Sequence, residues 1–208
     1  LPYLQRSGSI SCDYTVGGIY MWIDYFNYQY CIYRNTLFLK GVAEDDISKT
    51  AFSMPIGDLP INESVAVLGK YCSEHHYPLV FSAITEEHIA QFQTLNPLEI
   101  TELNHWADYI YSIEALATLK GKKLGKKRNH CNAFANEYPQ AVFSPILPNN
   151  LTSVKGCFAT ICETASDDPM ARFERLQVWK LLDHLHEFPY EAMCLAIDGK
   201  VVAFTIGE

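Results

Sequence analysis

The sequence predicts a mixed α/β fold, an α+β layer structure with a mixed sheet, built as two similar halves. Stretches with apolar residues every three or four positions alternate with short runs rich in Val, Ile, Tyr and Phe. Two pairs of such runs are joined by two-residue turns, which is typical of β-hairpins. The 208 residues are 49% hydrophobic and 19% charged, so one large or two small cores can form.

The first half begins with a helix and a hairpin. The aromatic segment 14–25 has helical spacing, and Ser11 or Asp13 can cap it. Two β-rich runs, 28–33 and 36–41, flank the turn Arg34-Asn35. A third strand is expected over 51–56.

Alternating helices and strands complete the first half. We expect a helix over 62–75 capped by Asn62, a strand over 78–83, a helix over 85–94 and a strand over 98–103. This order predicts a sheet that is antiparallel at the hairpin and parallel across its helical crossovers.

The second half repeats helical material followed by a hairpin. The expected elements are a strand at 107–111, a helical region at 112–138 ended by Pro139, a strand at 141–147, helices at 151–163 and 169–187, and a hairpin at 192–206 around Asp198-Gly199. We therefore divide the chain into a first domain, 1–111, and a basic helix with the start of a second domain, 112–208. Because the second half stops directly after its hairpin, we expect this domain to be incomplete and to continue beyond Glu208.

Composition excludes several classes of protein. No apolar run reaches the length of a membrane span and the amino terminus resembles no leader, so we expect a soluble, cytoplasmic protein. Seven scattered cysteines without a Cys-x-x-Cys pair predict mostly buried free thiols. The histidine pairs at 75–76 and 184–186 lack a second ligand cluster, so no metal site is expected.

The segment Lys120-Gly-Lys-Lys-Leu-Gly-Lys-Lys-Arg128 concentrates positive charge. It holds six of the sixteen basic residues in a chain of net charge −8, so the remainder carries −14. A lysine-rich run on a helix is commonly a solvated face. Here, however, no acidic residue lies between Lys120 and Asn136 to form helical ion pairs. The continuation into Asn129 and His130 adds further hydrogen-bonding side chains that suit phosphate or carboxylate.

An apolar stripe accompanies this charge. Leu124, Cys131, Phe134 and Tyr138 recur at helical spacing. The pattern predicts a helix docked by this stripe, with a positive face turned toward an anionic ligand.

Three motifs carry a resemblance to a known family. They are Ala107-Asp-Tyr-Ile-Tyr-Ser112, the run from Glu114 through the lysines to Phe134, and the closing Ile197-Asp-Gly-Lys-Val-Val-Ala-Phe-Thr-Ile-Gly-Glu208. Together they resemble the signature of an uncharacterised bacterial family related to the carboxy-terminal domain of phosphatidylglycerol lysyltransferase. At Gly125 the family usually carries a larger side chain, often His, which puts any role of this position in doubt.

The resemblance implies tandem acetyltransferase-like (GNAT) domains. That layout is shared with enzymes that move an aminoacyl group from a charged tRNA. Family members typically continue past the last residue here, in line with an incomplete second domain. A coenzyme A site of this fold needs a glycine-rich turn between its fourth strand and the next helix. The corresponding segment, 54–62, has an Asp and two prolines instead, so the first domain is not expected to bind coenzyme A.

The leading hypothesis is an acyl- or aminoacyltransferase, similar to a lysyl-phosphatidylglycerol synthase, with acyl-CoA or aminoacyl-tRNA as donor. The substrate-binding candidates are Lys123, Lys126, Lys127, Arg128 and His130. They would meet phosphate of a small molecule, a lipid headgroup or a tRNA acceptor end. No catalytic residue is assigned; Tyr109, Tyr111 or Glu114 could serve as acid or base, although packing or capping is the favoured interpretation.

Two other hypotheses stay open. The chain could be a non-catalytic anion- or protein-binding module that keeps the GNAT-like fold. Alternatively, the lysines only solvate their helix and the two domains form an interaction platform.

Overall fold

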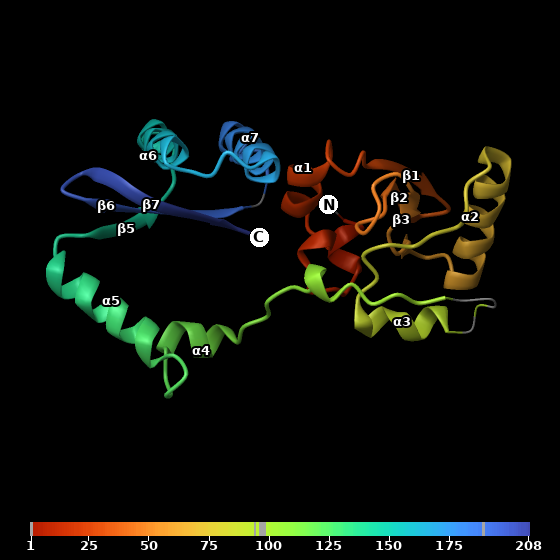
Figure 1. Cartoon of the computed structure of the whole chain (residues 1–208), viewed down its shortest axis with the longest axis horizontal. Coiled ribbons are helices and arrows are strands. Elements are labelled where there is room, and N and C mark those ends of the chain that lie inside the picture. Colours follow the sequence, from red (N-terminus) through yellow and green to blue (C-terminus); the bar gives the residue numbers. More distant parts are fainter. Residues whose placement is uncertain (1, 94, 96–98, 189) are drawn as a thin grey trace. The chain divides into compact units, whose positions relative to one another are not determined.

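The computed structural model describes all residues except 1, 94, 96–98 and 189 (Figure 1). The chain forms two compact units, Leu1–Asp108 and Tyr109–Glu208, each described here by itself. The described part is a mixed α/β structure with antiparallel sheets and seven α-helices.

Among its described residues, unit 1 (Leu1–Asp108) contains three α-helices and four strands. They are α1 (Val16–Trp22), β1 (Gln29–Tyr33), β2 (Thr36–Val42), β3 (Thr50–Phe52), β4 (Ile56–Gly57), α2 (Ile61–His75) and α3 (Glu86–Phe92). Thr15 caps α1, because its hydroxyl accepts a hydrogen bond from the Gly18 N–H. Ser11, one of the caps expected for this helix, instead caps a short 3-10 helix, Cys12–Tyr14, that precedes it.

The sheet of unit 1 confirms the predicted first hairpin. Strands β1 and β2 pair antiparallel with Tyr33 opposite Thr36, and the turn residues Arg34 and Asn35 both have positive φ. This backbone matches the twist of the strands that it joins. The third strand expected at 51–56 is two short strands, β3 and β4, and both pair with β2.

The parallel strands expected in unit 1 are reduced to one bridge. Phe81 pairs in parallel with Phe52, and the rest of 78–83 forms no strand. Of the strand expected at 98–103, residue 98 lies outside the described residues and 99–103 are irregular. A parallel strand needs a neighbour along its whole length, which local sequence does not reveal.

Two apolar clusters hold unit 1 together. One packs the sheet against the amino-terminal segment and α3, around Tyr14, Leu39 and Phe92. The other packs the opposite side chains of the sheet, Phe38 and Phe52, against Leu68 of α2. The sheet therefore has apolar residues on both faces, as in a layered α/β unit.

Unit 2 (Tyr109–Glu208) contains a helical segment and then a three-stranded sheet with two helices. Its elements are α4 (Ile113–Thr118), α5 (Gly125–Glu137), β5 (Val142–Pro145), α6 (Leu151–Glu163), α7 (Pro169–Asp183), β6 (Glu191–Ile197) and β7 (Lys200–Gly207). The sheet order is β5-β6-β7, all antiparallel. Val154 and Leu182, both 0% exposed, anchor its core.

Most elements of unit 2 were predicted. Helix α6 has the expected bounds, α7 ends at Asp183 rather than at 187, and the last hairpin turns at Asp198 and Gly199, which both have positive φ. The strand expected at 107–111 is wrong, since these residues are irregular. Both units place helices before a hairpin, as the sequence indicated.

The cysteines differ from expectation in their burial. All seven are free thiols, but only Cys72 and Cys194 are buried. Three are exposed: Cys12, Cys31 and Cys131.

Candidate functional site

The basic segment 120–128 spans a break between two helices. The single helical region expected over 112–138 is wrong, because α4 ends at Thr118 and α5 begins at Gly125. Lys120, Lys122 and Lys123 lie in the connection, whereas Lys126, Lys127 and Arg128 form the first turn of α5. All six side chains are exposed.

Arg128 takes part in the structure of this break. Leu119 adopts a left-handed backbone conformation with φ of 47°, and its N–H donates to the Ala115 carbonyl, so α4 is closed off there. The Arg128 Nη1 donates to the carbonyl oxygen of Leu119 over 2.5 Å. The guanidinium thus satisfies a carbonyl that the end of α4 leaves free. One of the five predicted substrate-binding residues therefore has a structural partner.

Of the other candidates, Lys123 precedes α5, and the remaining three divide between two faces of this helix. Lys126 and His130 lie one turn apart, while Lys127 shares its side of the helix with Cys131 and Phe134. The predicted apolar stripe is only partly covered: Phe134 and Tyr138 are half-buried, Cys131 is exposed, and α5 contains no buried residue. The firmly docked helix expected from the stripe is therefore wrong for this structure.

The basic segment has no acidic partner of its own. None of its six cations forms an ion pair with a carboxylate in the described part of the chain. Three of them stand in the first turn of α5, where no acidic residue is present and where the positive end of the helix dipole adds to their repulsion. A bound anion would lower this repulsion.

Three residues considered as acid or base lie just before this segment. Tyr109 and Tyr111 are 89% and 60% exposed, so the packing expected for them is wrong. Glu114 is an exposed residue in the first turn of α4, and that helix is capped by Ser112 instead. No described contact gives any of the three a catalytic geometry.

The turn compared with a coenzyme site is filled by the protein's own contacts. The Asp58 carboxylate accepts hydrogen bonds from Asn35 and Arg6, and both hold its pKa below the usual range. The Leu59 N–H donates to Thr36 Oγ1 over 2.9 Å, and a Cβ added at Gly57 would lie 2.3 Å from the Asn35 oxygen. This geometry favours the prediction that the first domain does not bind coenzyme A.

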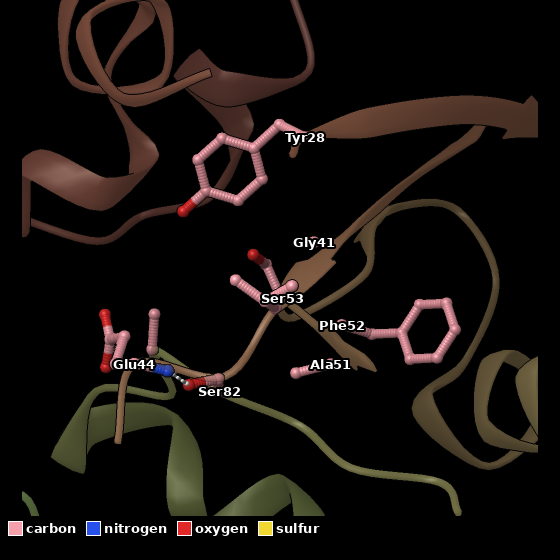
Figure 2. Close-up of a pocket in the computed structure, with 9 residues that line it drawn as sticks. Tyr28, Gly41, Glu44, Ala51, Phe52, Ser53 and Ser82 are labelled. Carbon is pink, nitrogen blue, oxygen red and sulfur yellow. Dashed lines mark hydrogen bonds between the residues drawn. The ribbon is translucent and has the colours of Figure 1, made fainter. Parts of the chain in front are cut away.

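A pocket that the sequence did not indicate lies in unit 1 (Figure 2). Three chain segments meet there: the end of β2 with Glu44, the end of β3 with Ser53, and the loop with Ser82. Tyr28, just before β1, forms another wall. The parallel bridge between Phe52 and Phe81 ends beside the pocket, because the next N–H on that side of the strand, that of Met54, donates to the Tyr14 hydroxyl. Separation of parallel segments at their carboxyl ends is a common origin of ligand sites.

Tyr14 fixes the inner wall of this pocket. Its buried hydroxyl donates to the Ala83 carbonyl over 2.8 Å and accepts from the Met54 N–H over 3.4 Å. Ala83 is held at φ of 57°, an uncommon conformation for a residue other than glycine. Its backbone N–H hydrogen bonds to Glu44, and the Glu44 N–H donates to Ser82 Oγ over 3.3 Å.

The charge around the pocket is negative. Burial first, and then the carboxylates of Asp13, Asp108 and Asp45 in that order, together raise the pKa of Glu44 to about 7. Burial also raises the pKa of Asp13. None of these four carboxylates forms an ion pair with a basic residue among those described. A carboxyl group with this pKa can accept or donate a proton at neutral pH.

Cys12 borders these carboxylates but is not an activated nucleophile. Its thiol donates to the Asp108 Oδ1 over 3.5 Å. Desolvation, then Asp13 and Asp108, raise its pKa to about 11, so the reactive thiolate is suppressed at neutral pH. The proton-transfer chemistry of this region therefore belongs to Glu44.

Sequence reasoning missed this pocket because its residues are distant along the chain. Glu44 stands in an acidic loop with Asp45 and Asp46, an ordinary solvated pattern. Glu44 differs from its two acidic neighbours because it follows closely after the largely buried strand β2. This position was the one feature of the sequence that could have indicated a partly buried carboxyl group.

Metal-binding groups and membrane-spanning helices are both absent from the described residues. Among the residues that the structure describes, no group of three His, Cys, Asp or Glu side chains could hold a metal ion. Within the same described residues, no helix combines the length and apolar character needed to cross a bilayer.

Comparisons with known proteins identify the family. A crystal structure titled a conserved protein of unknown function from Bacteroides thetaiotaomicron VPI-5482 is 25% identical, with a TM-score of 0.83 over 99% of this chain and 70% of that one. No curated protein matches the chain. The family described as phosphatidylglycerol lysyltransferase, C-terminal, matches residues 4–208. The match takes in nearly the whole sequence, both units included, and the chain belongs to this family of phosphatidylglycerol lysyltransferase C-terminal domains.

Proposed function

We propose that the protein is an acyl- or aminoacyltransferase of the lysyl-phosphatidylglycerol-synthase kind. The observation that carries the proposal is the family match over residues 4–208. The family is described by an enzyme that transfers lysine to phosphatidylglycerol, so transfer of an acyl or aminoacyl group is the chemistry to test first.

The order of elements supports tandem acetyltransferase-like (GNAT) domains. Unit 1 has a helix, a hairpin, short strands, helix α2 and then the parallel bridge at Phe81. Unit 2 has a strand, two helices and a hairpin. Helices followed by a hairpin recur in both units, and this repetition supports the tandem arrangement.

The basic segment is proposed to hold the phosphate-bearing substrate. Lys123, Lys126 and Lys127 are exposed, have no described acidic partner, and lie where the amino end of α5 adds positive potential. Arg128 and His130 extend this surface. The donor would be acyl-CoA or aminoacyl-tRNA, and the phosphate could equally come from a lipid headgroup.

Such a reaction requires little covalent chemistry from the protein. An amine or hydroxyl group attacks an ester or thioester, and the enzyme aligns the two and stabilises the oxyanion. Cations and N–H donors serve this purpose. A protein nucleophile is unnecessary, which fits the raised pKa of Cys12.

The test removes the lysines but keeps Arg128, because Arg128 also supports the end of α4. In K123Q/K126Q/K127Q we expect tRNA binding to weaken and its dependence on salt to flatten by about two to three units of slope. Binding is measured by filter retention from low to high salt, and acyl transfer from acetyl-CoA or lysyl-tRNA is measured in parallel.

A matched control removes the same charge elsewhere. R34Q/K49Q/K70Q replaces three exposed cations that each form an ion pair with a carboxylate. It should change binding much less than the first triple variant. If both triple variants lost tRNA binding equally, the effect would come from net charge alone. That outcome would contradict the assignment of the basic segment as the phosphate-binding site.

A non-catalytic binding module is the second candidate. The filled turn around Asp58 favours it, since this is where a coenzyme would bind in unit 1. This candidate predicts salt-dependent anion binding without turnover of either donor. Transfer activity that K123Q/K126Q/K127Q abolishes would exclude it.

A further inference from the structure

We propose that the pocket between Tyr28, Glu44, Ser53 and Ser82 binds the ammonium head group of a primary amine. The inference goes beyond the transferase proposal and does not depend on it, because every residue involved lies in unit 1. It stands on the form of the cavity, on its free hydroxyl groups and on its uncompensated negative charge.

The size of the cavity selects a head group. Its space, about 230 Å³ including the open mouth, leaves room inside for about one water-sized group. An ammonium group has that size, whereas a quaternary ammonium group does not. The open mouth allows the rest of an amine to remain outside.

The walls offer the acceptors that an ammonium needs. It presents three N–H donors and accepts nothing. Two hydroxyl groups of the lining, on Tyr28 and Ser53, hydrogen bond with no residue in the described ranges. The Glu44 carboxylate adds a charged acceptor, and the Tyr28 ring adds an aromatic surface that favours cations.

The surroundings favour a cation over a neutral ligand. Asp13, Asp108 and Asp45 all act on Glu44 with negative charge, and no basic residue in the described ranges forms an ion pair with it. An ammonium group would allow Glu44 to stay ionised within this group of carboxylates. A divalent metal suits the site less well, because no group of three His, Cys, Asp or Glu side chains in the described part of unit 1 could hold a metal ion.

The experiment measures binding of n-butylammonium to the full chain. The probe is titrated at pH 8 while the Glu side-chain carboxyl carbons are followed by NMR, with Glu44 assigned from E44Q. We expect saturable binding at millimolar concentrations. E44Q should weaken it by at least about tenfold, as expected for loss of one charge-assisted hydrogen bond.

Two matched controls decide the result. D45N removes a neighbouring charge from an exposed side chain outside the lining, and it should weaken binding by less than about twofold because exposed charges are screened. Tetramethylammonium should not compete. The proposal is overturned if E44Q binds as wild type, if D45N has the same effect as E44Q, or if tetramethylammonium, K⁺ or Ca²⁺ binds as well as n-butylammonium. Since no acyl donor is present, these outcomes are independent of transferase activity.

Discussion

Two carboxylates of unit 1 show how local partners set the charge of a side chain. Asp58 accepts hydrogen bonds from Asn35 and Arg6, and its pKa is lowered. Glu44 has one backbone donor but three acidic neighbours and is partly buried, so its pKa rises to about 7. Both stand in short acidic or polar loops, so residue type alone does not separate them. The difference lies first in the burial of Glu44, which raises its pKa, and in the hydrogen bonds from Asn35 and Arg6, which lower the pKa of Asp58.

The stability of the protein should depend on Glu44 with a defined sign. Its pKa rises from an ordinary 4.5 to about 7 on folding, so ionisation opposes the folded state as the pH rises through this window. E44Q should therefore be more stable than wild type above pH 7, and the gain should vanish below about pH 4.5. Because Glu44 is only partly buried, solvent screening reduces the effect to about 1–2 kcal/mol. Chemical denaturation at pH 5 and pH 8 measures it.

Asp58 provides the opposite case. D58N removes a carboxylate whose folded pKa is lowered, so the variant should be less stable than wild type at neutral pH. The difference should vanish as the pH falls through the acid range, because wild type then loses the contribution of the ionised Asp58. The same denaturation series serves as the comparison. A loss of stability in E44Q at pH 8 would contradict the assignment of its pKa.

At the scale of elements, helix starts differ in how well the sequence supports them. Helix α7 begins with Asp168 as N-cap and Pro169 in the first turn, and the Asp168 carboxylate accepts from the Ala171 N–H over 3.0 Å. Helix α5 begins without a capping side chain and with cations at its positive end. The start of α7 is stabilised by its own side chains, whereas the start of α5 leaves N–H groups and positive charges available to an anion.

Asp168 should contribute measurably to stability through this cap. D168A should lower the free energy of unfolding by about 1 kcal/mol, the usual value of such a cap. The adjacent D167A is the control, because Asp167 is 86% exposed and only pairs with Arg172. It should cost less than about 0.5 kcal/mol. Thermal denaturation of both variants distinguishes them, and equal losses would show that the cap has no special role.

At the scale of the whole molecule, each unit has apolar clusters of its own, two in unit 1 and one in unit 2 among the described residues. Val154, Leu182 and Cys194 belong to the core of unit 2, while Tyr14, Leu39 and Phe92 belong to unit 1. Each core joins helices to the apolar side of its own sheet. Stability should therefore be divided between the units.

A core variant tests this division. Leu182 is 0% exposed, and L182A should cost about 2–5 kcal/mol through lost burial and a remaining cavity. Hydrogen exchange should accelerate in β6 and α6 but change little in β2. Equal acceleration in both units would mean that they unfold as one cooperative body.

Local sequence determined much of the secondary structure. The two hairpins follow from the turns Arg34-Asn35 and Asp198-Gly199, in which Asn35, Asp198 and Gly199 are of types that tolerate positive φ. Helices α2 and α6 follow from apolar spacing within one segment, and their bounds were predicted to within about one residue. These features depend on neighbours along the chain, so the sequence alone contains their cause.

Only the tertiary structure decided the remaining features. Residues 78–83 and 107–111 have strand-like composition, yet a strand exists only where another strand offers its backbone. The basic helix is broken at Leu119, and Arg128 spans the break. The Glu44 pocket gathers segments that are distant in sequence, and electrostatic interactions depend on distance in space rather than along the chain. For this reason the sequence determined the elements and the positive segment, whereas folding alone placed a proton-exchanging carboxyl group in a cavity.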